Sequence, residues 1–269
     1  MNTNYKILKR IIAERLRPHL PVILHPNQFC GVQGNCFWSC GCGARRDAIA
    51  YAEISKKPLC SVSIDFSAAF DKISHEYLHK VLSTRGFDDT FIKRIKRLYD
   101  NATSEIQTNG FRSGQIPIKR SVRQGCSLSM LLYTLCLNTL IQSLEKHLSG
   151  IKIGRCQTRT VVTAYADDAT IYLTQVVDIP KMKELLLRCE TATGARINTQ
   201  KSRAMAIGNW DTTIQIMDIP YYKEIKMLGF HFSNSVNSAA AAVAAAETWS
   251  STIARVRVLP KTPTIETWP

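Results

Sequence analysis

Two adjacent aspartates between two apolar β-type runs constrain this chain more than any other feature. Residues 160–165 and 170–173 are rich in β-branched and aromatic side chains, and Ala166-Asp167-Asp168-Ala169 separates them. This pattern predicts a β-hairpin with an acidic turn. Neighbouring carboxylates are costly to bury unless a cation joins them. The plain alternative is a solvated Asp-Asp turn, because aspartate is common in turns.

A third aspartate favours the metal-binding alternative. Residues 59–66 (LCSVSIDF) predict a short buried strand that ends in Asp65, roughly a hundred residues before the pair. Three hard oxygen ligands from two strands suit Mg²⁺. Two such ions about 3.5–4 Å apart can activate a hydroxyl group and stabilise a leaving pyrophosphate. Asp65, Asp167 and Asp168 are therefore the candidate metal ligands.

The remaining pattern mixes helices and hairpins without regular βαβ repetition, which predicts the α+β class. A hairpin is expected over 104–122 around Asn109-Gly110, and further strands over 205–207 and 227–232. Beyond residue 235 the alanine-rich sequence predicts no packed core. Helices are expected over 5–17, 45–56, 75–85 (closed by Gly86), 88–98, 127–147 and 180–193 (followed by Gly194).

The charge balance favours a polyanionic partner. The 269 residues allow one large domain or two subdomains that share a core. With 35 Lys and Arg against 21 Asp and Glu, the net charge is +14, and nucleic acid is the commonest partner of such a chain. A merely solvated basic surface would give the same balance.

Cysteines and hydropathy bear on the compartment. The nine cysteines are odd in number and mostly scattered, so we expect free thiols in a reducing compartment. The cluster Cys30, Cys36, Cys40 and Cys42 lacks a usual zinc spacing. We find no signal-peptide pattern and no apolar run approaching the roughly 20 residues of a membrane span. The expectation is an intracellular protein, nuclear or cytoplasmic, without a membrane partner.

Four sequence blocks then carry a family resemblance. Residues 165–173 (YADDATIYL) resemble the YxDD box of reverse transcriptases. In the same order as in that family stand SIDFSAAFDKI (63–73), SVRQGCSLSMLL (121–132) and GARINTQKS (194–202), the last followed by Leu228-Gly229-Phe230. The chain most resembles the polymerases of non-LTR (LINE-like) retrotransposons of arthropod type. The resemblance covers roughly residues 5–235.

The resemblance implies a polymerase right hand, with a central antiparallel palm sheet backed by helices. Residues 1–58 would form partial fingers, 59–233 the palm with fingers insertions, and 234–269 a degenerate thumb start and tail. The implied activity is RNA-directed DNA polymerase: two Mg²⁺ ions (Mn²⁺ possible) would support transfer of a dNTP to a primer 3′-hydroxyl. RNA template, DNA primer and dNTPs are the implied partners.

The resemblance also assigns roles to individual residues. Asp65, Asp167 and the backbone of Phe66 would bind metal, with Asp168 supporting the site. Lys201 would protonate pyrophosphate, and Phe70 would be a steric gate against ribonucleotides. Without the motifs, Phe70 reads as a core residue and Lys201 as a solvated one. The implied nucleotide contacts are Arg123, Gln124 and Gly125, and the implied primer or template contacts are Tyr165, Ala166, Leu228, Gly229 and Phe230.

Departures from the family pattern leave a second hypothesis open. The family's strand with Arg-Pro-Ile would precede Tyr5, and a thumb would follow Phe230, so the chain resembles a version truncated at both ends. Ser127 and Met130 replace two common prolines. The alternative function is a catalytically inactive retroelement fragment that at most binds nucleic acid. Another palm polymerase, of group II intron or telomerase type, is disfavoured by the blocks at 63–73 and 121–132.

Overall fold

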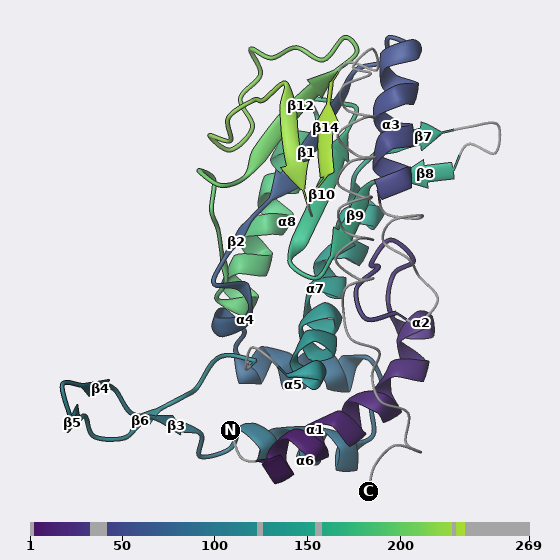
Figure 1. The fold of residues 1–269 in the computed structure, drawn as a ribbon. Coiled ribbons are helices and arrows are strands. Elements are labelled where there is room, and N and C mark those ends of the chain that lie inside the picture. Colours follow the sequence, from purple (N-terminus) through teal and green to yellow (C-terminus); the bar gives the residue numbers. More distant parts are fainter. Residues whose placement is uncertain (1–2, 33–41, 123–125, 154–157, 228–229, 235–269) are drawn as a thin grey trace, which may run out of the picture.

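In the computed structural model of the protein, residues 3–32, 42–122, 126–153, 158–227 and 230–234 are described (Figure 1). The helices are α1 (Thr3–Leu16), α2 (Leu20–Ile23), α3 (Cys42–Ile54), α4 (Ala69–Lys72), α5 (His75–Thr84), α6 (Asp89–Tyr99), α7 (Ser127–His147) and α8 (Asp178–Thr193), with a 3₁₀ turn, η1 (Arg17–His19). The strands are β1 (Leu59–Ile64), β2 (Phe66–Ser67), β3 (Thr103–Ser104), β4 (Gln107–Thr108), β5 (Phe111–Arg112), β6 (Ile116–Pro117), β7 (Ile151–Ile153), β8 (Thr158–Thr160), β9 (Val162–Tyr165), β10 (Asp168–Leu173), β11 (Arg196–Ile197), β12 (Arg203–Ile207), β13 (Glu224–Met227) and β14 (Phe230–Ser233). This mixture confirms the α+β class.

Local signals set several helix ends where the sequence predicts them. The Asp88 side chain accepts hydrogen bonds from the backbone N–H groups of Thr90 (2.8 Å) and Phe91 (3.3 Å), so it caps α6. Gly194 follows α8 with φ +82°, and a Cβ there would lie 1.7 Å from Arg120 Nη1. Glycine is therefore favoured at this helix end by its backbone angle, and a side chain there would also displace the end of the Arg120 side chain.

A four-stranded antiparallel sheet lies at the centre of the fold, with strand order β12-β1-β10-β9. β1 pairs with β10 so that Ser63 faces Thr170 and Ile64 faces Ala169. β9 and β10 form the expected hairpin, in which Tyr165 pairs with Asp168. The ends of β1 and the start of β10 therefore lie side by side, and Asp65 follows β1 at the same edge as the Asp pair.

The two faces of this sheet pack against different elements. Cys60, Val62 and Ile64 of β1 share the main core with α7 and α8, which lie behind the sheet in Figure 1. Leu59 of β1 and Tyr172 of β10 belong to a second core with α3, β13 and β14. Because strand side chains alternate between faces, the residues at 63, 168 and 170 share the second face.

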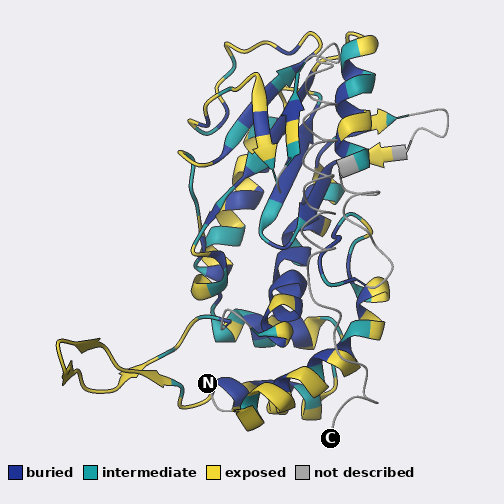
Figure 2. Cartoon of the chain, in the orientation of Figure 1, coloured by how far each residue is buried: buried dark blue, intermediate teal, exposed yellow. Residues whose placement is uncertain are grey.

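Judged by length and composition alone, α7 is long and apolar enough to cross a membrane. The expectation that no apolar run approaches the length of a membrane span was therefore wrong for this helix. However, 72% of the most apolar 18-residue stretch of this helix is buried inside the protein. Figure 2 shows the helix as mostly buried. A helix that is apolar all round is typical of a protein core as well as of a membrane. Its burial here identifies it as the central core helix.

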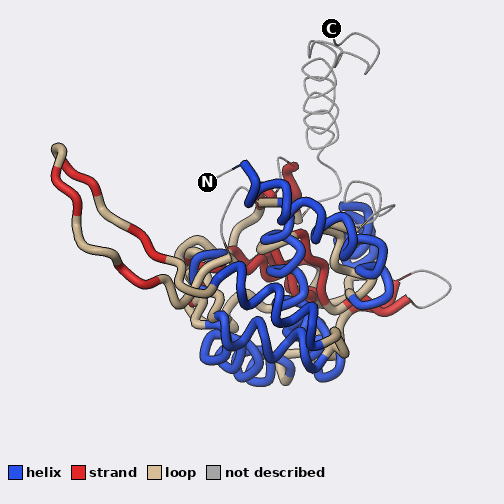
Figure 3. The backbone as a smooth tube through the Cα atoms, turned by 90° about the horizontal axis from the view of Figure 1, so that it is seen from below, coloured by secondary structure: helices blue, strands red, loops and turns tan. Residues whose placement is uncertain are grey.

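A projecting hairpin arm confirms the prediction for residues 104–122. β3 pairs with β6 and β4 with β5, and the arm extends away from the body in Figures 1 and 3. Asn109 (φ +49°) and Gly110 (φ +85°) form its two-residue tip. Positive φ at both positions is what a tight hairpin turn requires.

The pattern-based prediction of one continuous strand over 227–232 was wrong, whereas the antiparallel pairing of β13 with β14 agrees with the hairpin that the family resemblance implies around these positions. β13 ends at Met227 and β14 begins at Phe230, and these two residues pair with each other in an antiparallel hairpin. The connecting residues 228 and 229 lie outside the described part of the chain. The apolar run had hidden the reversal, because its two halves share one hydrophobic pattern.

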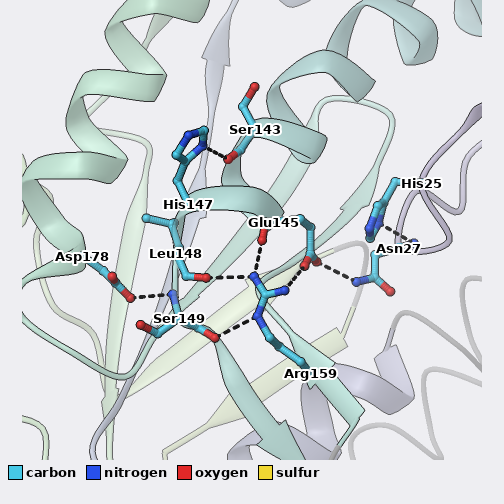
Figure 4. A network of polar contacts seen from close by, with 9 residues as sticks. All are labelled: His25, Asn27, Ser143, Glu145, His147, Leu148, Ser149, Arg159 and Asp178. Atoms are coloured by element: carbon cyan, nitrogen blue, oxygen red, sulfur yellow. Dashed lines mark hydrogen bonds and ion pairs between the residues drawn. The ribbon is translucent and has the colours of Figure 1, made fainter.

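Arg159 on β8 closes the C-terminal end of α7 (Figure 4). Its guanidinium donates to the backbone carbonyls of Glu145, Leu148 (2.9 Å) and Ser149 (3.0 Å), and its Nη1 lies 3.5 Å from Glu145 Oε2. Glu145 also accepts from Asn27 Nδ2 at 3.2 Å. A cation at a helix C-terminus satisfies carbonyls that have no partner within the helix. This network joins α7, β8 and the segment around residue 27.

We expect Arg159→Met to lower the free energy of unfolding by about 2 kcal/mol, because several charge-assisted hydrogen bonds are lost from a partly exposed site. Urea unfolding at pH 7 measures the change. Lys152→Met is the matched control, since Lys152 is an exposed cation directly opposite Arg159 on β7. Equal losses in the two variants would contradict a specific capping role.

Candidate active site

Asp65 stands where the chain leaves the central sheet. Directly after it, β2 pairs with β11 instead, with Phe66 opposite Ile197. The backbone of Asp65 is held on both sides: its N–H donates to Ser202 Oγ (3.0 Å), and its carbonyl accepts from the Asn198 N–H (2.8 Å). Ser202 Oγ in turn donates to the Asn198 carbonyl (2.8 Å). The turn at 198–202 therefore fixes the first aspartate in place.

The Asp pair lies on a tight hairpin that a segment from elsewhere in the chain supports. Ala166 is buried and has φ +53°, in the left-handed region that is unfavourable for a residue with a Cβ. The segment at 27–29 covers the free edge of β9: Ala164 N donates to Asn27 O (2.8 Å), and Phe29 N donates to Ala164 O (3.0 Å). This added pairing supports the strained turn from the side opposite β10.

Burial and neighbouring negative charge raise the pKa of both aspartates of the pair. Burial raises the pKa of Asp168 to about 6, and the negative charges of Asp167 and Asp65 contribute. Burial also raises the pKa of Asp167, again with a contribution from Asp65. All three carboxylates are therefore close enough to repel one another, and the site favours a bound positive charge.

These residues fit a divalent metal ion on two grounds. Their oxygens are the hard ligands that Mg²⁺ prefers, and their mutual repulsion is what a cation would relieve. Across the described ranges, no three His, Cys, Asp or Glu side chains converge closely enough to form a complete ligand set alone. Mg²⁺ is usually held by one or two carboxylates together with water and substrate phosphates, so the aspartates would supply only part of its ligand set.

Phe70 is connected to the surroundings of the Asp pair by a second aromatic ring, that of Tyr133. It is half-buried in α4 and stacks on Tyr133 of α7, with ring centroids 4.5 Å apart and an angle of 27°. Tyr133 is buried, and burial together with the charges of Asp167 and Asp168 raises its pKa well above the ordinary value. Tyr133 therefore stacks on the predicted gate residue and lies within electrostatic reach of the Asp pair.

The other predicted site residues divide into two groups. Lys201 is exposed and belongs to the turn that holds Asp65; Tyr165 and Phe230 are half-buried in β9 and β14. The assigned roles of these residues, and of the Phe66 backbone, stay predictions. Arg123, Gln124, Gly125, Leu228 and Gly229 lie outside the described residues.

Five cysteine side chains, Cys30, Cys60, Cys126, Cys136 and Cys189, are free thiols, as expected. Cys30 lies against the Asp hairpin, and burial raises its pKa to about 11. Cys36 and Cys40 lie outside the described residues, and so does the Cys42 side chain. The question of a zinc cluster there stays untested.

Several residues that build the site had not been singled out from sequence. Asn198, Ser202 and Tyr133 have no chemistry of their own, and only the fold brings them to the aspartates. Arg45 was also missed, although a signal existed: Arg45, Ala48, Ile49 and Ala52 are spaced as one helix face, and all four are buried. An arginine on an apolar helix face indicates a buried polar contact.

Comparison with known proteins decides the family. Residues 1–232 match the family described as "Reverse transcriptase (RNA-dependent DNA polymerase)", a range that contains every predicted site residue. The chain belongs to the reverse transcriptase family. Members of this family generally use divalent metal ions, and membership implies binding of a nucleic acid template.

The similar proteins are encoded by transposable elements of the non-LTR class. An uncharacterised 149 kDa protein of transposon TX1 from Xenopus laevis is 31% identical over 237 residues, covering 87% of this chain and 18% of that protein. A Pol polyprotein of the retrotransposable element R2 from Popillia japonica is 27% identical, covering 75% of this chain and 28% of that protein. This reverse transcriptase chain therefore spans under a third of the length of these relatives.

Solved structures confirm the polymerase fold. Telomerase from Candida tropicalis, bound to a fragment of telomeric RNA, matches 86% of this chain and 36% of its own chain with a TM-score of 0.58 and 11% identity. The telomerase without RNA from the same organism gives a TM-score of 0.58, 12% identity, and coverage of 85% and 39%. At this identity the likeness concerns the fold alone.

Removing the Asp168 charge should stabilise this protein at neutral pH without divalent cations. Between the ordinary value of 3.8 and about 6, the folded state binds more protons than the unfolded state, so stability falls as pH rises through this window. Above pH 6 the cost of the charged carboxylate is complete. For Asp168→Asn at pH 7.5 we expect a gain of about 1–2 kcal/mol, allowing for screening at a partly exposed site, and no gain near pH 4.

Thermal unfolding in EDTA across this pH range measures the effect, and added Mg²⁺ should stabilise the wild type more than the variant. Asp211→Asn is a control for which we expect the stability at pH 7.5 to fall instead of rise. Thr213 donates to Asp211 from its backbone (2.8 Å) and its hydroxyl (2.7 Å), and these bonds lower the Asp211 pKa. A loss of stability in Asp168→Asn at pH 7.5 would contradict this prediction, because it would show that the charge of Asp168 stabilises the folded protein.

Proposed function

We propose that this chain catalyses RNA-directed DNA synthesis, joining a dNTP to the 3′-hydroxyl of a DNA primer on an RNA template. The observation that carries this proposal is the set of three mutually repelling carboxylates at adjacent strand ends, in a chain of this family. When bound there, two Mg²⁺ ions would lower the pKa of the primer hydroxyl and neutralise charge on the phosphates.

The protein residues supply position and charge. The backbone of Asp65 is held by Asn198 and Ser202, and the hairpin that bears Asp167 is held by the segment at 27–29. These backbone contacts would position the two carboxylates before substrate arrives. Such preorganisation is the main contribution a protein makes to phosphoryl transfer. Phe70 would contact the sugar of the incoming nucleotide, and the exposed Lys201 would donate a proton to pyrophosphate. The net charge of +14 favours the nucleic acid strands as partners.

A second candidate function is nucleic acid binding without catalysis, which the basic charge alone would support. Primer extension on an RNA template, with Mg²⁺ or Mn²⁺ and all four dNTPs, separates the two functions. Extension products that require template and metal support the polymerase. Salt-sensitive binding of an RNA–DNA hybrid without any extension would replace the polymerase proposal with the binding function.

A further inference from the structure

We propose that Arg45 is a positioning residue that docks the β13–β14 hairpin onto the two strands carrying the candidate metal ligands. The inference deepens the proposed polymerase function and rests on it for its consequence, although the docking itself can be tested without catalysis. Arg45 lies on α3 and is completely buried. Its importance follows from what its guanidinium contacts and from where those contacts lie on the sheet.

The guanidinium contacts both β1 and β10. Arg45 Nη1 donates to Thr170 Oγ1 on β10 (2.9 Å) and to Ser63 Oγ on β1 (3.2 Å). These two residues pair directly across the strands, and their hydroxyl oxygens are 3.4 Å apart. Both bonds come from the same nitrogen, whose two N–H groups can donate to two acceptors at once. The planar guanidinium can also lie against an aromatic ring, which an ammonium group does less well.

The same side chain contacts the hairpin. Met227 Sδ of β13 lies 3.1 Å from Arg45 Nη1 and 3.4 Å from Thr170 Oγ1. The ring of Phe232 on β14 lies under the guanidinium, with 4.7 Å between Arg45 Cζ and the ring centroid. One side chain from α3 therefore connects β1, β10, β13 and β14.

These contacts lie two residues along the chain from Asp65 and from Asp168. Ser63, Asp168 and Thr170 occupy one face of the sheet, and Thr170 follows Asp168 by two residues. Ser63 precedes Asp65 by two residues, and Asp65 directly follows the end of β1. At strand rise, two residues correspond to roughly 7 Å. A shift of the guanidinium would therefore move the hairpin relative to the carboxylates and disturb the strand ends that bear them.

Backbone amide exchange tests the docking directly. In Arg45→Met and Arg45→Lys, we expect exchange at 224–227 and 230–233 to accelerate about tenfold or more, while β1, β10 and α7 keep their protection. Arg46→Met is the matched control: Arg46 is the next residue on α3 but is exposed, with an ion pair of 3.4 Å to Asp47. Unchanged exchange in the hairpin would overturn the proposal. Uniform loss of protection over all strands would also overturn it, since Arg45 would then be a general core residue.

The consequence for catalysis is measured separately. At a temperature where amide exchange shows the sheet intact, we expect Arg45→Lys to lower the kcat of primer extension about tenfold, with the KM for dNTP little changed. An unchanged kcat alongside a loosened hairpin would remove the link to catalysis. If the wild-type chain extends no primer, the polymerase proposal fails, and the exchange experiment still decides whether Arg45 docks the hairpin.

Discussion

Asp167→Asn should reduce primer extension by about 10³-fold or more while leaving the fold intact. Asparagine preserves the shape of the side chain but removes the charge that would hold a metal ion, and metal-assisted stabilisation of phosphoryl transfer amounts to several kcal/mol. The fold should survive, because the raised pKa of Asp167 shows that its charge is unfavourable in the folded protein. Single-turnover extension on an RNA template with saturating Mg²⁺ measures the rate.

Two controls separate lost chemistry from lost binding. Asp218→Asn makes the same substitution at an exposed position with φ +58°, a backbone region where asparagine is well tolerated, so its rate should match the wild type. Binding of an RNA–DNA hybrid should remain in Asp167→Asn, because the basic surface is unchanged. A rate above one tenth of the wild type would exclude Asp167 as a metal ligand.

The elements that the sequence predicted well are those with local signals. The helix start near Asp88, the glycine after α8 and the Asn109-Gly110 tip depend on interactions within a few residues, so they do not depend on the rest of the fold. The hairpin with the Asp pair belongs to the same class, since its two arms are adjacent in the chain. The limits of α7 also agreed with the predicted range, because the apolar run in the sequence has the same extent as the helix.

Contacts between distant segments could not be predicted in this way. The segment at 27–29 reads as irregular, yet it pairs with Ala164 and supports the Asp hairpin. Asn198 and Ser202 hold Asp65 across more than 130 positions of the chain. Nothing in the local pattern of either segment specifies a partner, because hydrogen bonding by backbone or hydroxyl groups is available to almost any residue.

The family blocks located the candidate site, but they did not show how it is supported. Asp65 and the Asp pair were identified by motif, and the structure adds their shared sheet edge and mutual electrostatic influence. Arg45 illustrates the remainder. Its place on an apolar helix face could be predicted from the sequence spacing. Its contacts with Ser63 and Thr170 could not, because they depend on how α3 packs on the sheet.

Phe70→Ala should weaken discrimination against ribonucleotides by at least about tenfold, the second large effect that we expect. Discrimination of this kind comes from a clash built against the wrong substrate, and here the 2′-hydroxyl would meet the ring of Phe70. The stacking of Phe70 on buried Tyr133 holds that ring in one position, which makes the clash hard to relieve. The ratio of kcat/KM for a dNTP to that for the matching ribonucleotide measures the effect.

Packing and gating can be distinguished because the chain contains a second stacked pair. Phe87 stacks on Phe91 with centroids 5.2 Å apart, so Phe87→Ala removes a comparable aromatic contact. Both alanine variants should lose stability, since an aromatic pair contributes about 0.5–1.5 kcal/mol beyond its buried area. Only Phe70→Ala should alter sugar selection. If both variants lose stability and neither changes the ratio, Phe70 serves only to pack Tyr133, and the gate must be sought elsewhere around the carboxylates.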